Sequence, residues 1–189
     1  MDEGYHGARV SVRSLQTSIQ GRPTMATETR TRTKIYPFLW YAKEAEEAAK
    51  LYASIFPDSK VESVTSMQSD SPSGPPGSVK VVTFTIMGQR FQAMSAGPHH
   101  DFNDAISFTV LCDDQAELDR YWDALLESGG KPQACGWIMD RFGLRWQIVP
   151  TAMQGWMADK DPVRSKRVTD AMLQMIKLDI PTLEKAYKG

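Results

Sequence analysis

The chain has 189 residues, of which 41% are hydrophobic and 24% charged, and its formal net charge is −1. This length suits one ordinary domain, and the composition is typical of a soluble globular protein. The small net charge gives no broad field for nucleic acid or an acidic membrane, and no apolar run approaches the ~20 residues of a membrane span. We therefore expect neither partner.

Cysteine usage indicates the compartment. Only Cys112 and Cys135 occur, which is too few for a secreted disulfide framework or a zinc site. The N-terminal stretch carries basic residues but no continuous apolar segment of the kind found in secretory signals. A reducing, cytoplasmic location is the expectation.

Residues 1–33 are rich in Ser, Thr, Arg and Gly and show no apolar periodicity. They are predicted to be a disordered or loosely attached tail, because they cannot bury enough surface to offset the entropy of ordering. Met25 would serve as a start, so the residues before it are either native or an upstream-start artefact. The paired domain is expected over 34–150, followed by a helical extension over 151–189.

Apolar patterning predicts strands and helices in alternation. In the first half we expect a strand over 35–41, a helix over 44–56, a strand over 60–67, a mobile loop over 68–78, and a hairpin of strands 79–87 and 90–95. In the second half we expect a strand over 105–112, a helix over 115–126, short strands over 133–135 and 137–139, a turn over 140–144 and a strand over 145–149. The remainder, 153–187, has helical periodicity.

The two halves form an internal repeat. A shift of 70 residues places Phe38 on Phe108, Glu47 on Glu117 and Tyr52 on Trp122, among other matches. The class is therefore α+β, with duplicated β-α-β-β-β modules and a C-terminal helical extension. Because neither half buries its apolar face alone, the two are expected to curl into one pocketed sheet system.

Several strings then resemble a known family. Pro37-Phe38-Leu39-Trp40-Tyr41, Cys135-Gly136-Trp137, Asp140-Arg141-Phe142-Gly143-Leu144 and Trp146-Gln147-Ile148-Val149-Pro150 stand in this order. Together with the duplication, they resemble PhnB-like proteins of the vicinal oxygen chelate (glyoxalase/bleomycin-resistance/dioxygenase) superfamily. Further strings, among them Ala171-Met172-Leu173-Gln174-Met175, extend the resemblance from about Lys34 to Gly189. Proteins of this kind often carry the label 3-demethylubiquinone-9 3-methyltransferase. No glycine-rich strand-to-helix turn for S-adenosylmethionine is found, so we interpret that label as inherited.

The resemblance implies a metal site in those members that chelate an ion with His and Glu. The corresponding positions here fall near Pro37 or Phe38, at Ala105, at Gln92 and at Gln147. Apolar side chains do not ligate, and a glutamine amide is a weak neutral ligand. We therefore expect neither metal nor another cofactor. The adjacent His99 and His100 are interpreted as solvated or gate-loop residues rather than ligands.

The leading hypothesis is a small-molecule-binding protein that acts by sequestration or sensing. The residues expected to bind the ligand are Trp40, Gln92, Met94, Cys135, Trp137, Arg141, Trp146 and Gln147. For Cys135 a packing role and for the Asp140-Arg141 turn a capping role are the competing interpretations. The alternative function is a metal-assisted lyase, isomerase or dioxygenase-type enzyme. A homodimer is expected, with Val168, Ala171, Met172 and Met175 docking across a two-fold axis.

Overall fold

The computed structural model describes residues 34–189, and the predicted tail 1–33 lies outside the described residues. Within them the elements follow the order β1 (Phe38–Tyr41), α1 (Ala45–Ile55), β2 (Lys60–Ser66), β3 (Lys80–Ile86), β4 (Gln89–Ser95), β5 (Phe108–Cys112), α2 (Gln115–Glu127), β6 (Lys131–Pro132), β7 (Trp137–Met139) and β8 (Arg145–Pro150). Three helices follow, α3 (Met153–Met157), α4 (Pro162–Leu173) and α5 (Ile180–Lys188). None of the helices in this part of the chain has the length and apolar character needed to cross a membrane.

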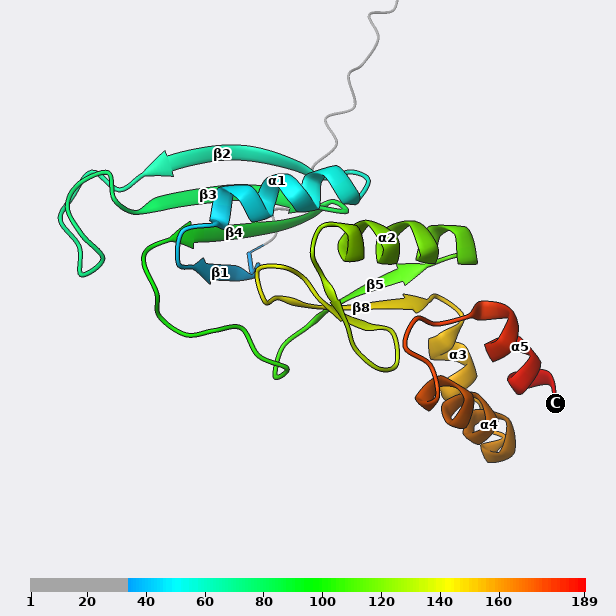
Figure 1. Ribbon diagram of the computed structural model, residues 1–189. Helices are drawn as coiled ribbons and strands as arrows, with labels where there is room; N and C mark the ends of the chain where they lie inside the picture. Colours follow the sequence, from blue (N-terminus) through cyan, green and yellow to red (C-terminus); the bar gives the residue numbers. More distant parts are fainter. Residues whose placement is uncertain (1–33) are drawn as a thin grey trace, which may run out of the picture. The chain divides into compact units, whose positions relative to one another are not determined.

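Two β-α-β-β-β modules are present, as the repeat predicts. The strand orders are β1-β4-β3-β2 and β5-β8-β7-β6, with the first strand of each module parallel to the last. In Figure 1, α1 lies across one face of the first sheet and α2 packs beside β5 and β8. The α+β class is confirmed. The strands form two separate four-stranded sheets, however, rather than one continuous system.

Alternation along each strand decides which side chains reach the core. Val82, Phe84 and Ile86 of β3 are buried, as are the α1 residues Ala48 and Tyr52. The intervening residues lie on the opposite face of each sheet, which we call the open face, because successive side chains point to opposite sides. On β3 the residues of that face, Thr83 and Thr85, are themselves buried. Side-chain packing rather than strand pairing joins the modules. The rings of Phe91 and Phe108 lie 5.2 Å apart, and those of Tyr52 and Trp146 lie 5.1 Å apart.

The β3–β4 hairpin turns one residue earlier than the sequence suggested. Met87 and Gly88 both have positive φ, 48° and 74°, which is the pattern of the two-residue turn that matches strand twist. The sequence pattern placed the turn at Gly88-Gln89, because glycine is the stronger turn signal.

The first strands of the two modules are related by a shift of 71 residues rather than the 70 expected from the sequence. In the parallel pairs, Phe38 lies opposite Gln92 and Thr109 lies opposite Gln147. The structural counterpart of Phe38 is therefore Thr109, a shift of 71, whereas the helices keep the shift of 70. Phe108 instead turns its ring toward Trp146, at 5.7 Å, on the helix side of the second sheet.

The segment 133–135 is not a strand, which corrects the prediction. Cys135 and Gly136 have φ of 60° and 81°, and their backbone amides donate to the carbonyls of Met175 and Ile176 at 2.8 Å each. The chain forms a left-handed bend here because the C-terminal extension takes the hydrogen bonds that a strand partner would have used. The short strand β6 lies earlier, at Lys131–Pro132.

The C-terminal extension packs on the second module of its own chain. Leu178, Leu183 and Val168 are at most 1% exposed and belong to the core, and Lys177 pairs with Asp119 and Asp123 of α2. Pro162 and Pro181 sit in the first turns of α4 and α5, after the capping residues Asp161 and Asp179. The expectation that Val168 docks across a two-fold axis is wrong, because this side chain is buried within the chain.

Candidate functional site

The two glutamines at the expected ligand positions lie on the open faces and are held by neighbouring hydroxyls. Gln92 donates to Thr83 Oγ1 at 3.0 Å and accepts from the hydroxyl of Tyr36 at 3.2 Å. Gln147 donates to Ser107 Oγ at 2.8 Å. These are neutral hydrogen-bonding arrangements in which the amides are oriented by the protein itself.

Such a donor set does not fit the metal that the resemblance implies for other members. Divalent transition ions favour imidazole, thiolate or carboxylate ligands. The residues that lie opposite the two glutamines, Phe38 and Thr109, supply none of these groups. Across residues 34–189, no three His, Cys, Asp or Glu side chains gather closely enough to hold an ion.

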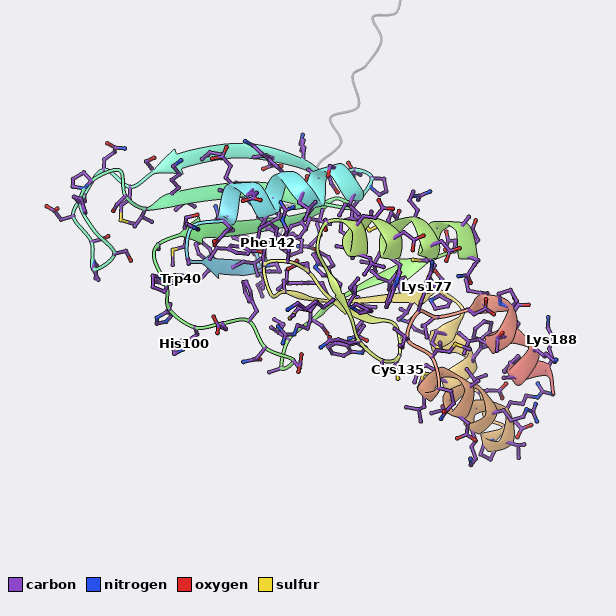
Figure 2. All side chains as sticks on the ribbon, viewed as in Figure 1. Trp40, His100, Cys135, Phe142, Lys177 and Lys188 are labelled. Atoms are coloured by element: carbon purple, nitrogen blue, oxygen red, sulfur yellow. The ribbon has the colours of Figure 1, made fainter. Side chains whose placement is uncertain are left out.

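A hollow lies where three segments that are far apart in the sequence meet. It has a volume of about 630 Å³ and is formed by the end of β1 and the start of α1, by residues 98–102 of the connection between modules, and by the turn 139–145. We call it the loop cavity. Figure 2 shows Trp40, His100 and Phe142 in this region, whereas Cys135 lies apart from them beside the C-terminal helices.

Aromatic side chains make up much of the wall of the loop cavity. Trp40 donates its indole N–H to the carbonyl of Gly97 at 2.9 Å, which fixes the ring, and its ring centre lies 4.7 Å from that of His99. Phe102 and Phe142 pack edge-on against Tyr41, at 5.2 Å and 6.0 Å.

Arg141 also reaches the loop cavity, but it already has partners. Its guanidinium pairs with Glu47 at 2.6 Å and lies 4.8 Å from the centre of the Phe142 ring. The expectation that Arg141 faces a ligand remains a prediction, and its charge is balanced within the chain.

The turn that presents Arg141 is built around a buried carboxylate. Asp140 is 1% exposed, and its Oδ1 accepts from the backbone amides of Phe142 and Leu144 at 2.9 and 3.0 Å. The capping interpretation of this turn is therefore confirmed. Its Oδ2 accepts from the hydroxyl of Tyr52 at 2.7 Å and the indole N–H of Trp146 at 2.9 Å. Asp140 thus ties the first module to the second directly under the cavity wall.

Burial affects the titration of the groups around Asp140. The pKa of Tyr52 is raised well above its ordinary value, chiefly because burial penalises the phenolate and also because Tyr41 and Asp140 are close. The pKa of Tyr41 is raised mainly by burial as well. Both phenols therefore remain protonated donors. Burial likewise raises the pKa of Cys112 to about 12, which agrees with a core role for that thiol.

The remaining predicted residues are dispersed. Met94 lies beside Trp40 in the first sheet, while Trp137 lies opposite Gln147 in the second. Cys135 and Trp137 line a separate shallow hollow of about 320 Å³ with Asp104, Gln133 and Ala134. Trp146 is 1% exposed and lies in the core, so its indole is inaccessible to a ligand in this structure.

Sequence reasoning missed Glu44, Phe102 and Phe142 as parts of a site. The weak signals were the His-His pair in the 96–103 loop and the aromatic residue inside the Asp140 turn. Neither signal shows that these loops meet, because they are separated from each other and from β1 by whole elements of the chain.

Two β-α-β-β-β modules with these strand orders define the vicinal oxygen chelate, or glyoxalase-like, fold. More narrowly, residues 33–149 match the family profile described as 3-demethylubiquinone-9 3-methyltransferase, and the chain belongs to this family. The match ends at residue 149, short of the Gly189 that the C-terminal strings suggested. No curated protein sequence matches the chain.

Among the solved structures that the chain resembles, one with a TM-score above 0.5 agrees with this placement. A PhnB protein from Bacillus cereus is 28% identical, with a TM-score of 0.55 over 63% of this chain and 100% of its own. A protein from Pseudomonas aeruginosa is 24% identical, with a TM-score of 0.46 over 62% and 96% of the two chains. The fosfomycin resistance protein FosX from Listeria monocytogenes, solved with Mn(II) and sulfate, is 14% identical, with a TM-score of 0.45 over 61% and 88%.

Proposed function

We propose that this protein binds a small organic molecule in the loop cavity without a metal ion, and that it acts by sequestration or sensing. The observation that carries the proposal is the cavity itself. Its volume of about 630 Å³ lies within the ~300–1,000 Å³ usual for ligand sites, and its aromatic walls offer apolar contact area. The ring of Trp40, oriented by its bond to the carbonyl of Gly97, is part of these walls.

The glutamines on the open faces support the metal-free part of the proposal. The side-chain amides of Gln92 and Gln147 donate hydrogen bonds to hydroxyls of the same chain. As a metal ligand, a neutral amide is a poor substitute for imidazole or carboxylate. A ligand that depends on a chelated ion is therefore less compatible with this chain than one held by packing and hydrogen bonds.

The methyltransferase wording of the family name receives no support from the strand-to-helix connections. A strand that leads into a helix through a glycine-rich turn is the usual cradle for a nucleotide-like cofactor. Here β1 leads into α1 through Ala42-Lys43-Glu44, and β5 leads into α2 through Asp113-Asp114. Neither connection contains glycine, and both carry acidic residues.

The test is a mass-spectrometric screen for organic molecules that co-purify with the wild-type protein, repeated on Trp40→Ala and on Trp137→Ala. We expect a molecule bound near one per chain that is lost from Trp40→Ala and retained by Trp137→Ala, the matched control in the shallow hollow. The reverse pattern would move the site to the second sheet.

Elemental analysis of the same preparations separates binder from enzyme. A stoichiometric divalent metal whose removal by chelator also releases the organic molecule would overturn the proposal in favour of the metal-assisted enzyme. Heat of binding on titration with S-adenosylmethionine would overturn it in favour of the methyltransferase.

A further inference from the structure

Around the loop cavity the positive charges have ion-pair partners, whereas some of the negative charges do not. Its two guanidiniums both have carboxylate partners, since Arg141 pairs with Glu47 at 2.6 Å and Arg145 pairs with Asp104 at 2.6 Å. Arg145 also donates to the carbonyls of Phe102 and Gly143. Neither cation therefore offers an unpaired positive charge to a ligand.

Two carboxylates at the cavity have no positively charged partner. Glu44 is half-buried at the start of α1, and its Oε2 accepts from the backbone amide of Lys43 at 3.0 Å. Asp101 lies in the connection between the modules. Within residues 34–189 neither carboxylate forms an ion pair.

The aromatic walls also favour a positively charged ligand. The faces of aromatic rings carry negative potential and attract cations within about 6 Å of the ring centre. One wall already demonstrates this, because the guanidinium of Arg141 lies 4.8 Å from the centre of the Phe142 ring. Trp40, the ring type that binds cations best, also lines the cavity, where its bond to the carbonyl of Gly97 fixes the ring.

From this combination we propose that the ligand of the loop cavity is an organic cation, an ammonium or amidinium group on an apolar or aromatic body. The inference rests on the proposed function and adds the charge of the ligand to it. The positive group would lie toward Glu44 and Asp101, and the apolar body against Trp40 and Phe102.

Three probes of nearly equal shape and different charge test the inference by calorimetric titration at pH 8 and low salt. They are benzyltrimethylammonium, the neutral 2-methyl-1-phenylpropan-2-ol and the anionic phenylmethanesulfonate. We expect the cation to bind about tenfold more tightly than either of the others, because both the ring faces and the unpaired carboxylates discriminate by sign. Added salt should reduce the difference.

Variants then assign the preference to the cavity. Glu44→Gln and Asp101→Asn each remove one negative charge with little change in shape, and each should weaken the cation several-fold while leaving the neutral probe unaffected. The matched control is Glu127→Gln, which removes an exposed carboxylate at the end of α2, outside the cavity, and should change nothing.

Each outcome decides the matter. Equal binding of the cation and the neutral probe would overturn the charge preference but leave the loop cavity as a binding site. Tightest binding of the sulfonate, lost in Arg141→Gln, would reverse the sign of the inference. Absence of binding by all three probes would also overturn it, whereas the proposed function would then stand or fall on the co-purification experiment.

Discussion

Replacing Tyr52 by phenylalanine tests whether the buried carboxylate of Asp140 holds the two modules together. The change deletes one hydroxyl in a side chain that is fully buried between α1 and β8. That hydroxyl donates to Asp140 Oδ2 at 2.7 Å and also contacts the hydroxyl of Tyr41 at 3.1 Å. The ring and its aromatic neighbours remain, so the variant isolates the polar part of the contact.

The magnitude follows from the kind of hydrogen bond that is lost. A bond to a charged acceptor contributes about 1.5–3 kcal/mol, and the neutral bond to Tyr41 adds about 0.5–1 kcal/mol. Asp140 keeps three other donors, which limits the penalty. We expect Tyr52→Phe to lower the free energy of unfolding by about 2–3 kcal/mol, and the melting temperature by roughly 4–12 °C for a domain of this size.

Urea denaturation followed by far-ultraviolet circular dichroism gives the free energy directly, and an unchanged m-value would show that the unfolded state is comparable. Tyr121→Phe is the matched control. This tyrosine has an equally buried ring, but its hydroxyl donates to the partly exposed Glu117 at 2.8 Å and accepts from the exposed Arg120 at 3.1 Å, so we expect less than about 1 kcal/mol. A double-mutant cycle with Asp140→Asn should give a coupling energy above about 1 kcal/mol.

Equal losses in Tyr52→Phe and Tyr121→Phe would refute the reasoning, because they would mean that the carboxylate contributes no more than a surface contact. A coupling energy near zero between positions 52 and 140 would refute it independently.

Other measurements address the rest of the molecule. The free energy of unfolding should fall as pH rises above about 10, less so in Tyr52→Phe, because the raised pKa of Tyr52 keeps the folded phenol protonated while the unfolded one ionises; parallel curves would contradict this. Gly136→Ala should cost about 2 kcal/mol, since φ is +81° and a Cβ would lie 2.9 Å from the carbonyl oxygen of Ile148, whereas Gly155→Ala, with open space around it, should be tolerated; similar melting temperatures for the two would show that the bend adapts. Light scattering should give twice the 21.2 kDa chain mass, with or without chelator, if the chain forms the homodimer that we propose from its sequence; a monomer would exclude the homodimer.

The modules were predictable because their signals are local. The apolar face of α1, with Ala48 and Tyr52, and the alternation of Val82 and Phe84 follow directly from the periods of helix and strand. The 70-residue self-match then required two copies of one unit. The C-terminal helices were equally visible, although the breaks before Pro162 and before Pro181 were not anticipated.

The site was harder to predict for two physical reasons. Trp146 and Gln147 are adjacent in β8, and successive residues of a strand point to opposite faces, so both cannot line one open face. Which of them faces the core depends on the neighbouring helix, and here it is Trp146, held by Asp140. The loop cavity depends on the meeting of irregular segments, which have no periodicity to interpret.

The bend at Cys135 and Gly136 has a consequence for the order in which the chain assembles during synthesis. The first module is contiguous from β1 to β4, so its sheet and α1 can pair as soon as residue 95 has left the ribosome. The second module is completed later, because the backbone amides of its bend donate to the carbonyls of Met175 and Ile176, and its core includes Leu178 and Leu183. We therefore expect the nascent chain to fold sequentially, with the second module completed only when the last helix emerges.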